Sequence, residues 1–249
     1  MAMIGPLATS ELALYYQPQM TADGRTLACA EALIRKLHPT RGISGPGEFL
    51  NQLSAEELEA LDLWVLDRAS RDMRAWPGLT VSINAAATQF RHADFAERAL
   101  ETIADAGGDP SRLEIEIVEA SIISDFDAAL ANINRLRAAG VRIALDDFGT
   151  GYSSLTYLLK LPLDKVKIDR SFIQHVDTMQ AAAIVHAIVA LARSIGLKVT
   201  AEGVETLAQQ RFLRAAGCHY LQGFLFSAAI SADGITRMVN PEAAQRASA

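Results

Sequence analysis

The chain has 249 residues, of which 29 are acidic, 23 are basic and half are hydrophobic. Its net charge of −6 argues against nonspecific binding to nucleic acid polymers, which requires a basic face. Two cysteines, Cys29 and Cys218, exclude a disulfide framework and favour a reducing compartment. A chain of this length buries about three quarters of its unfolded surface, so it needs neither a disulfide nor a structural metal to fold.

No targeting segment or membrane span is expected. Residues 1–10 have no basic flank and no apolar core of signal-peptide length, and we expect them to be a tag or the remnant of a linker. His186 and Arg193 interrupt the most apolar stretch, residues 181–197, which predicts an amphipathic helix rather than a membrane span. The sequence therefore predicts a cytoplasmic domain over residues 11–240, followed by a C-terminal tail over residues 241–249.

Strand patterns and helix patterns alternate along the chain. Eight strands are predicted, at residues 12–18, 27–35, 79–85, 113–118, 141–146, 163–169, 197–202 and 219–225. Ser54 and Glu57 form a capping box for a helix that runs to about Trp76. Other helical segments end at glycines, as C-terminal caps do, namely Gly107, Gly140, Gly196 and Gly217. This alternation predicts a mostly parallel sheet.

Polar and apolar side chains alternate within the predicted strands. In residues 113–117 leucine and isoleucine alternate with Glu114 and Glu116, and in residues 81–84 Ser82 and Asn84 share one face. Because side chains in a strand point alternately to opposite faces, each strand has one apolar and one polar face. A closed (β/α)8 TIM-like barrel gathers the polar faces in its interior, whereas an open doubly wound sheet buries them unpaired beneath helices. An α/β barrel is therefore predicted, with the open sheet as the alternative.

Every predicted strand carries a polar residue near its C-terminal end. In chain order these residues are Gln17, Glu31, Arg35, Asn84, Glu116, Asp146, Lys167, Glu202 and Gln222. Active sites of α/β barrels are built at this end of the strands. We therefore expect the functional site here.

The acids of this group need compensating positive charge. Five carboxylates carry −5 in total, namely Glu31, Glu116, Asp146, Asp147 and Glu202. Oxygen donors without histidine or thiolate suit Mg²⁺ or Mn²⁺ rather than zinc, so two divalent cations are predicted as cofactors. The charged residues nearer the strand starts, Glu114, Arg142 and Lys198, are interpreted instead as a structural ion-pair network.

These residues also suggest two other kinds of site. Residues 146–154 nearly match a dinucleotide-binding glycine motif, but Ser154 stands at the third glycine position and two adjacent carboxylates would repel a pyrophosphate. Lys167 could serve as a Schiff-base lysine in an aldolase-like barrel. Neighbouring acids without metals would raise its pKa and weaken it as a nucleophile.

Taken together, the motifs resemble the EAL domain, the cyclic di-GMP phosphodiesterase family of bacteria. The naming motif is Glu31-Ala32-Leu33, extended to Arg35, and the resemblance covers about residues 11–230. The other motifs follow in family order: Tyr16-Gln17-Pro18, Asn84, Glu116 with Glu119, Asp146–Ser154, Lys167-Ile168-Asp169, Ala201–Glu205 and Gln222-Gly223.

The resemblance implies a role for each matching residue. Glu31, Asn84, Glu116 and Asp146 would hold one Mg²⁺ or Mn²⁺, and Asp146, Asp147 and Glu202 a second. Lys167 would act on the attacking water. Gln17, Leu33, Arg35 and Gln222 would position the dinucleotide, and Glu119 would support the loop after Asp147. The implied reaction is hydrolysis of cyclic di-GMP to linear pGpG by metal-activated water.

The resemblance also implies a context for the domain. One barrel strand is expected to run antiparallel to the others, a GGDEF or sensory domain is expected as a neighbour, and a homodimer is expected as the assembly. Departures from the family pattern stand at Lys36, Ala86, Val118 and Ala228-Ala229. The alternative function is a non-catalytic cyclic di-GMP receptor or a partner-binding module.

Overall fold

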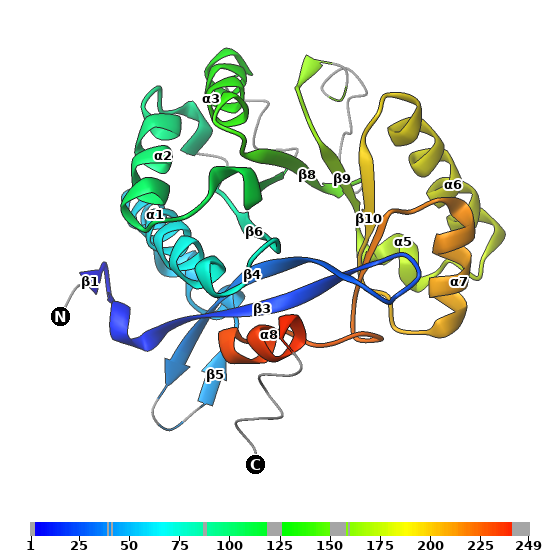
Figure 1. Cartoon of the computed structure of the whole chain (residues 1–249), viewed down its shortest axis with the longest axis horizontal. Coiled ribbons are helices and arrows are strands. Elements are labelled where there is room, and N and C mark those ends of the chain that lie inside the picture. Colours follow the sequence, from blue (N-terminus) through cyan, green and yellow to red (C-terminus); the bar gives the residue numbers. More distant parts are fainter. Residues whose placement is uncertain are drawn as a thin grey trace.

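The computed structural model describes residues 3–38, 40, 42–86, 89–118, 126–149, 158 and 160–240. Eight strands form a closed barrel in the order β3-β11-β10-β9-β8-β7-β6-β4, and β4 pairs back with β3 (Figure 1). The barrel strands are β3 (Leu12–Thr21), β4 (Leu27–His38), β6 (Thr80–Asn84), β7 (Leu113–Val118), β8 (Arg142–Phe148), β9 (Lys165–Ile168), β10 (Lys198–Ala201) and β11 (Tyr220–Gln222). The predicted barrel is thus confirmed over the open sheet.

Strand β3 runs antiparallel to both of its neighbours, β4 and β11, while the other neighbouring barrel strands are parallel. Only residues 22–26 separate β3 from β4. A parallel crossover needs about a dozen residues or more, so this connection permits only a hairpin. The reversed strand expected from the family resemblance is confirmed.

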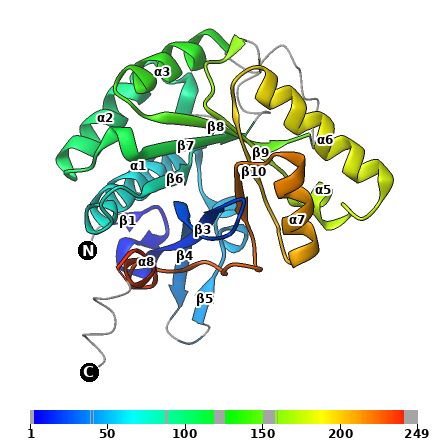
Figure 2. The same ribbon diagram turned by 45° about the vertical axis from the view of Figure 1, so that its right-hand side comes forward.

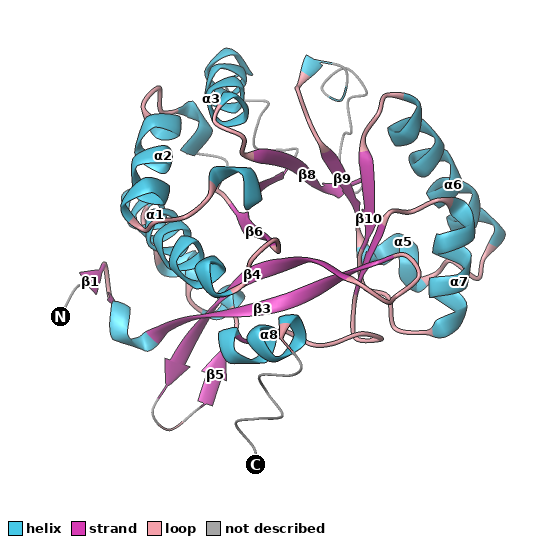
Figure 3. Cartoon of the chain, in the orientation of Figure 1, coloured by secondary structure: helices cyan, strands magenta, loops and turns pink. Residues whose placement is uncertain are grey.

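Helices surround the barrel on its outer side (Figures 2 and 3). They are α1 (Ala55–Asp72), α2 (Phe95–Asp105), α3 (Phe126–Ala138), α5 (Arg170–Gln174), α6 (Met179–Ser194), α7 (Leu207–Ala216) and α8 (Ala232–Val239). Short strands extend or flank the barrel, namely β5 (Gly42–Ser44), β12 (Ile230–Ser231) and the hairpin of β1 (Met3–Ile4) and β2 (Leu7–Ala8). No helix among the described residues is both long and apolar enough to cross a membrane.

The predicted helix signals are present where the sequence places them. The Ser54 hydroxyl accepts the backbone N–H of Glu57 at 3.2 Å, and the Glu57 carboxylate accepts that of Ser54 at 2.7 Å. At the end of α7, Gly217 has φ of 99°, a left-handed conformation that favours glycine. The apolar stretch predicted to be a helix forms most of α6 and ends just beyond it. The buried side of α6 includes Val185, Ile188 and Val189.

The barrel interior is polar and the layer between strands and helices is apolar. Ile115, Ile143 and Val166 are fully buried in that outer layer. The ion-pair network predicted near the strand starts is partly wrong. Glu114 does form a buried ion pair, but its partner is Lys165, at 2.7 Å, which was not a predicted member. Two of its predicted members, Arg142 and Lys198, lie further toward the opening at that end, where solvent reaches them.

Both cysteines are buried and free. Burial raises the pKa of each thiol to about 12. Cys29 and Cys218 are therefore packing residues rather than reactive groups.

Candidate active site

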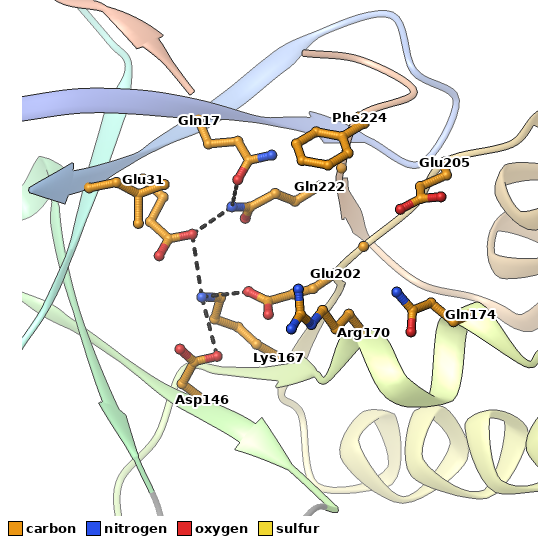
Figure 4. Close-up of a pocket in the computed structure, with 13 residues that line it drawn as sticks. Gln17, Glu31, Asp146, Lys167, Arg170, Gln174, Glu202, Glu205, Gln222 and Phe224 are labelled. Atoms are coloured by element: carbon orange, nitrogen blue, oxygen red, sulfur yellow. Dashed lines mark hydrogen bonds and ion pairs between the residues drawn. The ribbon is translucent and has the colours of Figure 1, made fainter. Parts of the chain in front are cut away.

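Lys167 lies at the centre of the C-terminal end of the barrel. Its side chain is 1% exposed, and its ammonium nitrogen lies 2.6 Å from Glu202, 3.2 Å from Asp146 and 3.6 Å from Glu31 (Figure 4). It also forms an ion pair with Glu116. One lysine therefore faces four carboxylates from four different strands or strand ends.

These contacts shift the pKa values in opposite directions. Burial alone would lower the pKa of Lys167, but the surrounding carboxylates outweigh it and hold that pKa well above its usual range. Burial, with the charge of Glu31 next, raises the pKa of Glu116 well above its usual value. The pKa of Glu202 is raised to about 7, chiefly by burial. A lysine that stays protonated among four carboxylates is a poor Schiff-base nucleophile.

The environment of Glu31 favours the ionised form of its carboxylate. Burial favours its neutral form, but Lys167, the Gln222 amide and the Asn84 amide together lower its pKa. Gln222 Nε2 donates to Glu31 at 2.5 Å and to Gln17 Oε1 at 3.2 Å, and Asn84 Nδ2 donates to Glu31 at 2.8 Å. These hydrogen bonds link β3, β4, β6 and β11 into one polar surface.

A second cluster of acids lies at the end of β8. Asp146, Asp147 and Glu202 each offer a carboxylate oxygen, and the three oxygens lie within 4.8 Å of one another. Asp147 has φ of 54°, and the pairing of β8 with β9 shifts register between Leu145 and Phe148. The irregularity interrupts the alternation of side chains, so consecutive aspartates both face Glu202.

The chemistry of this donor set fits hard divalent cations. Its ligands are carboxylate and amide oxygens, which Mg²⁺ and Mn²⁺ prefer. Burial, then the neighbouring Asp146, raises the pKa of Asp147 as well, so Lys167 alone does not balance the acids. In the described part of the chain, Gln222 Oε1 is a buried acceptor without a hydrogen-bond partner. Divalent cations would supply the missing positive charge.

A cavity of about 250 Å³ opens above these residues (Figure 4). Several predicted residues line it, namely Gln17, Glu31, Leu33, Asp146, Lys167, Glu202 and Gln222. Sequence reasoning missed the other half of its wall, formed by Arg170 and Gln174 of α5 with Glu205 and Phe224. Glu205 lies in a motif that the sequence analysis identified, and Phe224 follows the Gln222-Gly223 motif directly. Their closeness to these motifs could have indicated that both residues line the site.

Two predicted residues, Arg35 and Asn84, have a different placement. Arg35 is not among the residues that line this cavity, and its guanidinium donates to the Ile34 carbonyl at 2.9 Å. Asn84 borders a neighbouring apolar cavity instead, although its amide contacts Glu31. Glu119 lies outside the described residues, as do residues 150–154 of the glycine segment.

None of the residues that depart from the family pattern lines this cavity. The Lys36 ammonium is 3.9 Å from Glu11, and the Ala86 N–H donates to Asp62 at 2.9 Å. Val118 is partly exposed beside Ala86 at the wall of the apolar cavity. The Ala228 carbonyl accepts the hydroxyl of Ser227. None of these contacts replaces a residue of the acidic cluster.

Comparison with known proteins identifies the family. A model described as the EAL domain matches residues 5–229. The chain belongs to the EAL domain family. This EAL domain is 42% identical over 240 residues to the bifunctional diguanylate cyclase/cyclic di-GMP phosphodiesterase MucR of Pseudomonas aeruginosa, matching 94% of the chain and 35% of MucR. It is 40% identical to the cyclic di-GMP phosphodiesterase NbdA of the same species, over 89% of the chain and 29% of NbdA.

Solved structures of EAL proteins share this fold. A complex of the PaMucR phosphodiesterase with c-di-GMP is 42% identical, has a TM-score of 0.85 and covers 91% of this chain and 95% of that one. A manganese/cy-diGMP complex of Klebsiella pneumoniae BlrP1 is 30% identical, with a TM-score of 0.79, and covers 90% of this EAL domain and 58% of that chain. The chain spans about a third of the length of the two curated relatives named above.

Proposed function

We propose that this EAL domain hydrolyses cyclic di-GMP to linear 5′-pGpG and requires divalent cations to do so. The observation that carries the proposal is the arrangement of Glu31, Glu116, Asp146 and Glu202 around Lys167 at the C-terminal end of the barrel. Relatives named as cyclic di-GMP phosphodiesterases support the substrate.

The metal ligands proposed for this site come from five strands or strand ends. Glu31, Asn84, Glu116 and Asp146 would hold one cation, and Asp146, Asp147 and Glu202 a second. When bound, such ions lower the pKa of water and stabilise negative charge on phosphoryl oxygens. The manganese/cy-diGMP and calcium/cy-diGMP complexes of BlrP1 support this donor set.

Different side chains would orient the attacking water and hold the substrate. The Lys167 ammonium, which stays protonated, donates its N–H groups toward the carboxylates and would orient the attacking water. Gln17, Leu33 and Gln222 line the cavity and would hold the dinucleotide. Arg35 would bind a phosphate once its guanidinium leaves the Ile34 carbonyl, because a planar fork of donors suits phosphate oxygens.

The test is product analysis by chromatography after incubation with cyclic di-GMP. We expect linear pGpG with Mg²⁺ or Mn²⁺, no product after metal removal by EDTA, and recovery when either ion is restored. Ca²⁺ prefers more ligands at longer distances, so it should bind without supporting turnover. Full hydrolysis in EDTA would contradict the need for metal.

The alternative is a receptor that binds cyclic di-GMP without hydrolysing it. Saturable binding without product in Mg²⁺ or Mn²⁺ would favour the receptor. Retention of every proposed ligand for the metals favours the enzyme.

The bifunctional name of MucR supports a neighbouring GGDEF or sensory domain in the full protein. Homodimerisation stays a prediction, which sedimentation velocity tests.

A further inference from the structure

A second cavity, of about 410 Å³, lies at the end of the barrel opposite the acids. Its wall is built largely from the first residues of successive barrel strands, including Thr80, Glu114, Arg142, Lys165, Lys198 and Tyr220. Arg137 of α3 and Asp164 complete its charged lining. We call this the basal cavity. None of these residues belongs to the proposed catalytic site.

Two pairs of opposite charges in the basal cavity are already neutralised. Lys165 and Glu114 are buried and lie 2.7 Å apart. Arg137 donates two hydrogen bonds to Asp164, at 2.8 and 3.2 Å. The Asp164 carboxylate also accepts the backbone N–H of Ile143 at 2.9 Å. Both carboxylates of the lining are thus committed to these partners.

Arg142 and Lys198 are the excess charges. Among the described residues neither forms an ion pair, and Arg142 uses one N–H to donate to the Ser111 carbonyl at 2.7 Å. The lining therefore carries four cations against two carboxylates, a surplus of +2, in a chain whose net charge is −6. Positive charge is concentrated at this end, while the catalytic end carries the acids.

The remaining wall of the basal cavity adds an aromatic surface. The Lys165 ammonium lies 4.9 Å from the centre of the Tyr220 ring, and Leu163 and Cys29 supply apolar surface beside it. A guanidinium with free donors binds phosphate oxygens in a planar fork, and a nearby ammonium adds a point charge. We propose that the basal cavity binds a small phosphate-bearing anion between Arg142 and Lys198.

The proposal is tested by calorimetric titration of the protein with inorganic pyrophosphate. Protein and buffer are freed of divalent cations with a chelating resin, because a soluble chelator is itself a polyanion. Without metal, the acids at the catalytic end repel the probe. We expect saturable 1:1 binding that weakens as ionic strength rises, since the two cations are partly exposed to solvent.

The deciding variants are Arg142→Gln combined with Lys198→Gln, with Arg135→Gln as the control. Arg135 is an exposed arginine of α3 and does not line the cavity. The double variant should bind pyrophosphate at least tenfold more weakly, and the control should stay within twofold of the unmodified protein. Unchanged cyclic di-GMP hydrolysis in the double variant would show that it folds.

Two results would overturn the proposal: no saturable heat with the unmodified protein, or equal affinity in the double variant. Neither result bears on the proposed phosphodiesterase, because hydrolysis is measured separately and none of the three substituted residues belongs to its site.

Discussion

Lys167 is the central cation of the catalytic end, because four carboxylates share its ammonium group. In our proposal it acts in the hydrolytic step. Arg35 lies four residues beyond Glu31 on β4 and contacts a backbone carbonyl instead of the acids. The two cations should therefore affect different kinetic constants.

We expect Lys167→Ala to lower kcat strongly with little change in affinity for cyclic di-GMP. Arg35→Ala should weaken affinity by about 1.5–3 kcal/mol, roughly 10- to 150-fold, as for a charge-assisted hydrogen bond. Steady-state kinetics and equilibrium binding of both variants measure this. Lys36→Ala is the control, since its pair with Glu11 is long and partly exposed. A Lys167→Ala protein that loses only affinity would show that the roles are assigned wrongly.

In our proposal Glu202 should make metal binding dependent on pH. Its pKa in the metal-free protein is about 7, so below that pH a cation must displace a proton. Apparent affinity for Mn²⁺ should fall by at least about tenfold for each pH unit below 7, because the pKa values of Glu116 and Asp147 are raised as well. Titrations followed by the electron paramagnetic resonance of free Mn²⁺, from pH 5.5 to 8.5, test this. Constant affinity between pH 5.5 and 7 would rule out this proton competition.

At the scale of elements, helix α1 approaches the catalytic end through a half-buried acid, Asp62. Asp62 accepts the backbone N–H of Ala86 at 2.9 Å, just beyond β6. Burial is the larger effect and raises the pKa of Asp62 to about 6, although the Ala86 N–H lowers it. A raised carboxyl pKa stabilises the fold at low pH, and that contribution is lost as pH rises from about 4 through 6.

We therefore expect Asp62→Asn to gain stability relative to the unmodified protein as pH rises from 4 to 8, by about 2–3 kcal/mol at most. The asparagine oxygen can still accept the Ala86 N–H. Urea unfolding at both pH values measures the change. Asp67→Asn serves as the control, because this acid lies on the same helix in a partly exposed pair with Arg71. An identical pH response in both variants would mean that Asp62 is not the source.

At the scale of the whole molecule, the proposed metal ligands connect strands that are distant in sequence. Glu31 lies on β4, Glu116 on β7 and Asp146 on β8, while Glu202 follows β10. Repulsion among these acids opposes closure of the barrel at this end, and bound cations would remove it. Metal binding should therefore stabilise the complete fold.

We expect Mn²⁺ at about 100 times its dissociation constant to add about 2.7 kcal/mol, which corresponds to roughly 5–10 °C in Tm for a domain of this size. Thermal unfolding followed by circular dichroism, with and without Mn²⁺, measures the shift. Asp146→Asn should lose most of it, because Asp146 is shared between both proposed sites. A Tm that does not respond to millimolar Mn²⁺ would argue against this cation cluster.

Local sequence determined the barrel, its polar interior and most of the catalytic end. Alternation of Glu114 and Glu116 with isoleucines sets which face of β7 is polar, because the pleat alone directs successive side chains to opposite faces. The same rule predicted that Lys167 and Asp146 lie on the polar faces of their strands. The reversed β3 could also have been predicted without the family resemblance, since residues 22–26 are too few for a crossover.

Only the tertiary structure decided which of these side chains meet. Contacts across a barrel depend on the stagger between strands, which no local pattern specifies. That stagger pairs Glu114 with Lys165 rather than with Arg142 or Lys198. The irregularity at Asp147 and the approach of α5, with Arg170 and Gln174, to the cavity likewise result from packing between distant segments. The sequence therefore determined which residues face the interior, and the closed barrel determined their partners.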